Sequence, residues 1–122
     1  IQFAQLDYVD DPPSKYVFPQ TDLAMTVLSL EQIPRNHRIA LQNIHLHCQM
    51  ASIHIEPIVE RMPLTPWGLV ANAHHRKMDY LRGFPDSVQA LGIIPLEERV
   101  LDSAPSRYHC HSLWVLKSKN HP

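Results

Sequence analysis

The sequence predicts an α+β domain: a mostly antiparallel sheet of about five strands, with one main helix and one or two short helices packed on one face. Two observations lead to this prediction. Apolar and polar residues alternate in several short segments, which is typical of half-buried strands, and one longer segment carries apolar residues at helical spacing. The order along the chain is strands, then helical segments, then a last strand, which favours α+β over alternating α/β folds.

The size and composition of the chain fit one domain. Its 122 residues are 44% hydrophobic and 19% charged, as in ordinary globular proteins, so we expect residues 1–122 to form a single domain. No apolar run approaches the ~20 residues of a membrane helix, and no secretory signal opens the chain. We therefore expect no membrane association and favour a cytoplasmic location. A formal net charge of −1 makes nucleic acid an unfavourable partner.

Four segments in the first half of the chain are predicted to be strands. Residues 1–9 alternate loosely and end at a pair of prolines. Residues 22–30 form a nearly continuous apolar run, which indicates a strand buried on both faces. Residues 38–50 alternate cleanly between apolar and polar side chains. Residues 52–60 continue extended, and Pro57 indicates that this strand lies at an edge of the sheet.

The main helix is predicted over residues 65–83. Thr65 is a suitable N-cap, Pro66 suits the first helical position, and Gly83 suits the position that follows the last helical residue. Apolar side chains recur between these ends at helical spacing.

The rest of the chain is predicted to form two short helices and a final strand. Residues 86–92 and 95–102 are the short helices, the second opening with Pro95. Residues 106–117 return to alternation as the final strand, and we expect it to lie beside residues 38–50.

Two His-x-His motifs are the first candidate site. Side chains two residues apart in a strand point to the same face, and neighbouring strands lie ~4.8 Å apart. If the strands 38–50 and 106–117 are neighbours, their four imidazoles gather on one face beside an arginine. The candidate ligand-binding residues are His45, His47, His109, His111 and Arg107.

The same face could also hold a metal ion. Neutral imidazoles together with a carboxylate are suitable ligands for a divalent transition metal such as Zn²⁺. His54 and Glu56 are again two residues apart and would add a third strand to the site. The candidate metal ligands are His45, His47, His54, Glu56, His109 and His111.

A third set of residues resembles a nuclease family. The run His45-Leu46-His47, followed by Tyr80 on the predicted main helix, resembles the His–hydrophobe–His nucleases of rolling-circle replication and plasmid transfer. The resemblance implies a metal held by the two histidines on a central strand and a DNA phosphodiester attacked by Tyr80. Phe84 stands where that family's Tyr-x-x-x-Lys pattern has its lysine.

The function predicted first is therefore a ligand- or partner-binding module, accessory or regulatory, with a His-lined sheet face. The alternatives are a metal-dependent enzyme using the two His-x-His strands and a DNA-nicking endonuclease using Tyr80. The partner would be a small molecule or a protein, and a homo-oligomer is a further alternative. The nine histidines would raise the net charge from about +1 at pH 7 to about +7 at pH 5.5.

The two cysteines are expected to be reduced. One pair of cysteines is weak support for a disulfide in a chain long enough to form a core. We therefore predict that Cys48 and Cys110 are buried thiols.

Overall fold

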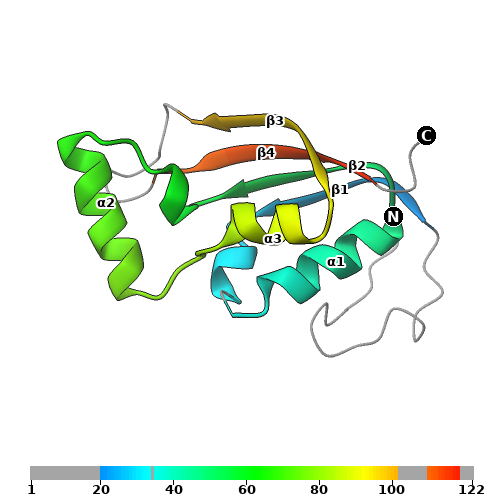
Figure 1. Cartoon of the computed structure of the whole chain (residues 1–122), viewed down its shortest axis with the longest axis horizontal. Helices are drawn as coiled ribbons and strands as arrows, with labels where there is room; N and C mark the ends of the chain where they lie inside the picture. Colours follow the sequence, from blue (N-terminus) through cyan, green and yellow to red (C-terminus); the bar gives the residue numbers. More distant parts are fainter. Residues whose placement is uncertain (1–19, 34, 102–109, 119–122) are drawn as a thin grey trace.

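Four strands form one mixed sheet in the computed structural model, which describes residues 20–33, 35–101 and 110–118 (Figure 1). Within them the order across the sheet is β1-β2-β4-β3. β1 runs parallel to β2, whereas β2 with β4 and β4 with β3 are antiparallel. The strands are β1 Thr21–Val27, β2 Cys48–Glu56, β3 Ile94–Val100 and β4 Ser112–Lys117. The predicted α+β class with mostly antiparallel pairing is confirmed, and the strand predicted over residues 1–9 lies outside the described residues.

Two helices cover one face of this sheet. α1 (His37–His47) and α3 (Phe84–Ala90) lie along the same side of it, whereas α2 (Pro66–Lys77) stands at one end (Figure 1). Two short 3-10 turns, η2 (Leu30–Gln32) and η3 (Val59–Arg61), complete the described elements. The core lies between the sheet and the two helices and consists of Leu30, Ala40, Leu41, Ile44, Ile58, Leu81, Phe84, Val88, Ile93, Trp114 and Leu116.

The start of the main helix is confirmed and its end is earlier than predicted. The Thr65 side chain accepts a hydrogen bond from the Gly68 amide at 3.1 Å, and Pro66 occupies the first turn. The helix ends at Lys77 because Asp79 takes a left-handed conformation with φ of 56°. Gly83 does not end this helix: it precedes α3, with φ of 69°.

The strand predicted over residues 38–50 is wrong, because residues 37–47 form α1. His37, Ala40, Leu41 and Ile44 are all buried, and their spacing of three and four residues places them on one helical face. Extended backbone begins only at Cys48. The alternation of apolar and polar residues over 38–50 therefore corresponds to a strand only from Cys48 onward.

The helix predicted over residues 95–102 is also wrong, because residues 94–100 form the edge strand β3. Pro95 lies opposite Leu116 of β4, and a proline is tolerated in an edge strand. Glutamate, arginine and leucine in this segment favour a helix locally. Backbone pairing with β4 outweighs that preference.

Two strands occupy other places in the sheet than predicted. β1 lies at an edge and is mostly exposed, so the expectation for 22–30 of burial on both faces is wrong. β2 lies inside the sheet, and Pro57 follows its last residue instead of marking an edge. The short helix predicted over 86–92 is confirmed by α3, and the final strand is confirmed over Ser112–Lys117 by β4. Cys110 and His111 precede that strand, and residues 106–109 lie outside the described ranges.

No helix in the described ranges is both long enough and apolar enough to cross a membrane.

Candidate functional site

The first His-x-His pair lies on a helix, so its two side chains diverge. Residues two apart in an α-helix are rotated by about 200° from each other. His45 is buried, with its Nε2 atom 3.1 Å from the Ser52 hydroxyl, whereas His47 is half-buried, with its Nδ1 atom 2.8 Å from the Asn43 carbonyl. The expectation that these imidazoles share a strand face is therefore wrong.

The second pair is only partly described. His111 is buried directly before β4, whereas Arg107 and His109 lie outside the described residues. β4 pairs with residues 51–56 of β2 and with β3, so the predicted pairing with residues 38–50 is wrong. The Met50 carbonyl accepts a hydrogen bond from the Ser118 amide at 2.9 Å, beyond that ladder. Nowhere in the described residues do three or more His, Cys, Asp or Glu side chains form a group that could hold a metal ion. Ligand binding by Arg107 and His109 stays a prediction.

His54 and Glu56 are both fully buried on the side of β2 that faces the helices. The two ring nitrogens of His54 are both engaged: Nδ1 lies 2.8 Å from the Thr26 hydroxyl, and Nε2 lies 2.8 Å from the Ser52 hydroxyl. A metal ligand needs a nitrogen lone pair that is free to face the ion. His54 in this arrangement is therefore a structural residue.

The Glu56 carboxylate binds the start of η2. Its Oε1 atom accepts hydrogen bonds from the amides of Ser29 and Leu30, each at 3.2 Å, and its Oε2 atom accepts one from the Glu31 amide at 3.4 Å. Burial raises the pKa of Glu56, while these bonds and one from the Thr26 hydroxyl lower it. All of these partners are donors, which suits an ionised carboxylate.

The hydroxyls and imidazoles form one chain with a consistent direction. If the Thr26 hydroxyl donates to Glu56, it must accept from the Nδ1–H of His54. The Nε2 atom of neutral His54 then accepts from the Ser52 hydroxyl, which in turn accepts from the Nε2–H of His45. We call the sequence of hydrogen bonds His45–Ser52–His54–Thr26–Glu56 the buried polar chain.

Burial keeps His54 neutral within the buried polar chain. Burial lowers the pKa of His54 from 6.5 to about 3, and the neighbouring His45 lowers it further within that shift. Its five residues come from α1, β1 and β2, and its carboxylate end holds η2. The arrangement fixes these elements to one another. No member is exposed enough to meet a ligand at the surface, apart from half-buried Thr26.

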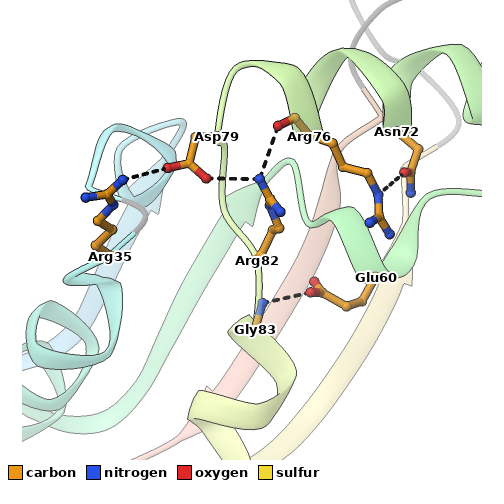
Figure 2. Close-up of polar contacts among 7 residues, drawn as sticks. All are labelled: Arg35, Glu60, Asn72, Arg76, Asp79, Arg82 and Gly83. Carbon is orange, nitrogen blue, oxygen red and sulfur yellow. Dashed lines mark hydrogen bonds and ion pairs between the residues drawn. The ribbon is translucent and has the colours of Figure 1, made fainter.

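The arginines near the end of α2 are paired within the chain (Figure 2). Asp79 lies between two of them, 3.0 Å from Arg82 and 3.7 Å from Arg35. Arg82 also donates to the Arg76 carbonyl at 3.1 Å. Arg76 donates to the Asn72 side chain at 2.6 Å. Each of these three arginines therefore contacts a polar group of the chain near the end of α2.

Tyr80 does not meet the pair His45 and His47 in the way that the nuclease resemblance implies. The two histidines lie on α1, where the family has a central strand. Tyr80 lies beyond the end of α2, and its ring stands 4.9 Å from the ring of His75. The described residues therefore lack the strand-borne histidine pair on which the resemblance depends.

The second face of the sheet carries the surface that the sequence prediction missed. In β2 the polar residues Ser52, His54 and Glu56 face the core, and apolar residues face outward. The strand register extends this outward face across the sheet in three rows. We call it the open face, and its rows are Leu23–Ala51–Lys117, Met25–Ile53–Val115 and Val27–Ile55–Leu113.

The open face is most exposed along β1. Leu23, Met25 and Val27 are 57%, 65% and 47% exposed, while Ile53 and Ile55 of β2 are half-buried. No described helix packs on this side (Figure 1). The sequence signal for the open face was the alternation of apolar and polar residues over 51–56 and 23–27. Only the arrangement of strands and helices shows which of the two sets of side chains faces the helices.

Comparison with known proteins identifies no family: no protein-family model, curated protein or solved structure matches the chain.

Proposed function

We propose that this chain is a protein-binding module whose partner covers the open face of the sheet. The observation that carries the proposal is the inverted alternation of β2. Its polar side chains are satisfied inside the core, and its apolar side chains, Ala51, Ile53 and Ile55, face away from the helices. In a sheet with one solvent-exposed face, a strand normally has its apolar side chains toward the core and its polar side chains toward solvent.

The partner is expected to be a protein with an apolar surface. A contiguous apolar patch with a polar rim is typical of protein–protein contact sites. The open face has charged side chains toward β3: its first row ends at Lys117, which pairs with Ile94, and the other two rows are followed by Glu97 and Arg99. Aliphatic side chains offer few hydrogen-bonding groups for a polar small molecule, which favours a protein over a small ligand.

A substitution at the centre of the open face tests the proposal. Ile53→Lys places a charge in the middle row, and Leu64→Lys is the matched control, because Leu64 is 93% exposed and precedes α2, outside the open face. Each variant and the native protein would be immobilised and exposed to extract of the source cells, and retained proteins would be quantified by mass spectrometry. We expect one discrete partner to be retained by the native protein and by Leu64→Lys, and to be lost with Ile53→Lys.

The binding must then be reproduced with the purified partner. An affinity reduced tenfold or more by Ile53→Lys, with an unchanged circular dichroism spectrum, supports the open face as the contact surface. Equal affinity for both lysine variants would contradict the proposal, as would a set of retained proteins that does not depend on residue 53.

A further inference from the structure

The two edges of the sheet differ in how they resist pairing with another strand. β3 contains a proline, Pro95, and a register irregularity between Pro95 and Glu97. It also carries the charged run Glu97, Glu98 and Arg99. Prolines, bulges and charges are the features by which edge strands avoid pairing. β1 also has a register irregularity, between Thr21 and Leu23, but it has no proline and one charged residue, Asp22, in its seven residues.

The outer edge of β1 offers backbone groups at alternate residues. The Leu28 amide donates to the Ile55 carbonyl of β2 at 3.0 Å. In an extended strand, backbone groups point alternately to the two sides, so the carbonyl of Val27 points away from β2. The same alternation directs the N–H and C=O groups of Met25 and Leu23 outward. Within the described residues β1 pairs with β2 alone.

We propose that two copies of this chain form a dimer in which β1 pairs with β1 in antiparallel orientation. A two-fold axis at Ala24 places Leu23 of one copy opposite Met25 of the other, and Thr21 opposite Val27. Leu23, Met25 and Val27 are the residues whose backbone groups point outward. Asp22 then lies opposite Thr26, so no like charges meet across the pair. The strand is therefore complementary to itself.

The dimer is closed and leaves the open face uncovered. A two-fold pairing uses the β1 edge of each copy, and the remaining edges are both β3, which resists further pairing. The formal net charge of −1 gives little repulsion between copies at neutral pH. The two sheets merge into one that is twice as wide, with the exposed Leu23 and Met25 of both copies at its centre. This self-association is separate from the binding of a partner on the open face.

Two β1 variants and one matched control test the dimer. Met25→Pro removes an outward N–H group and leaves the hydrogen bonds to β2 in place. Leu23→Lys puts a charge beside the pairing edge, and Leu96→Lys is its control, because Leu23 and Leu96 are 57% and 58% exposed on opposite edges. Mass would be measured across a concentration series of the full chain by analytical ultracentrifugation. We expect a dimer for the native protein and for Leu96→Lys, and a dimer dissociation constant at least tenfold higher for both β1 variants.

Amide hydrogen exchange supplies a readout that does not depend on the variants folding well. In the native dimer the amides of Leu23, Met25 and Val27 should exchange more slowly as concentration rises, while β3 amides should not change. A native protein that remains monomeric at its highest soluble concentration overturns the proposal. So does a dimer that survives both β1 variants but is lost with Ile53→Lys, because that result indicates face-to-face packing on the open face.

Discussion

Polar side chains occupy the inner side of β2, where a core usually has aliphatic ones. Ser52, His54 and Glu56 are each fully buried. Burying such groups costs free energy unless each hydrogen bond is replaced within the protein. The buried polar chain provides such bonds in sequence, from His45 to the amides at the start of η2. These side chains therefore hold β1, β2, α1 and η2 in register and are not a surface site.

Removing the Glu56 side chain should be strongly destabilising. Glu56→Ala leaves the buried amides of Leu30 and Glu31 and the part-buried amide of Ser29 without their acceptor, so we expect a loss of about 2–4 kcal/mol in the free energy of unfolding. Glu60→Ala is the matched control, since Glu60 also accepts from a backbone amide, that of Gly83, but at an exposed position. We expect it to cost about 1 kcal/mol or less. Urea unfolding measures both, and equal losses would contradict a structural role of the buried carboxylate.

Elements with local end signals were predictable, and elements that depend on distant partners were not. Thr65 and Pro66 mark the start of α2 in any context, so the sequence alone locates it. α1 was missed because His37, Ala40, Leu41 and Ile44 form a helical face in a segment that also alternates. β3 was missed because its pairing with β4 is a tertiary contact that outweighs local helix preference.

The tight approach of Gly68 to the preceding loop gives a prediction for α2. A Cβ atom on Gly68 would lie 1.8 Å from the Pro63 carbonyl oxygen, which is backbone and cannot turn away. Although alanine favours a helix over glycine by about 1 kcal/mol, we expect Gly68→Ala to destabilise the protein by about 3 kcal/mol or more, because the start of the helix must move.

Gly83→Ala is the comparison for that variant. A Cβ atom at Gly83 would meet no described residue within 4 Å, and the obstacle to alanine there is its φ of 69°. The cost of a left-handed alanine is about 1–2 kcal/mol. Thermal unfolding followed by circular dichroism ranks the two variants, and a Gly68→Ala protein as stable as Gly83→Ala would show that the Pro63 contact relaxes freely.

At the scale of the whole molecule, the sheet has one face under helices and one face open. The α+β class followed from periodicity, but the location of the candidate site did not. The alternating pattern of residues 51–56 is compatible with either set of side chains facing the helices. Which set faces α1 and α3 depends on strand order and on where the helices pack. The His-x-His hypothesis failed at the same step, since it needed residues 43–47 to be extended, and they are helical.

The buried polar chain links the stability of the whole fold to pH. His54 has a pKa of about 3 when folded and 6.5 as its ordinary value, so between these values the unfolded chain binds a proton that the folded protein does not. The free energy of unfolding therefore falls as pH falls from about 6.5 toward 3, by about 1.4 kcal/mol per pH unit for this one proton. Glu56 acts in the opposite direction, because its pKa is raised: above pH 4.5 its ionisation costs stability until its folded pKa is passed.

The variant His54→Gln isolates the histidine contribution, because glutamine can both donate and accept in place of the ring but does not titrate. Its stability at neutral pH is expected to be lower, since the amide cannot reproduce both ring contacts with Thr26 and Ser52. Its loss of stability on acidification should nevertheless be shallower than that of the native protein, by up to about 1.4 kcal/mol per pH unit below pH 6.5. Urea unfolding of both proteins at about pH 7, 6 and 5 gives the two slopes. Parallel slopes would mean that His54 accepts a proton without opening the fold, and that its burial does not hold it neutral.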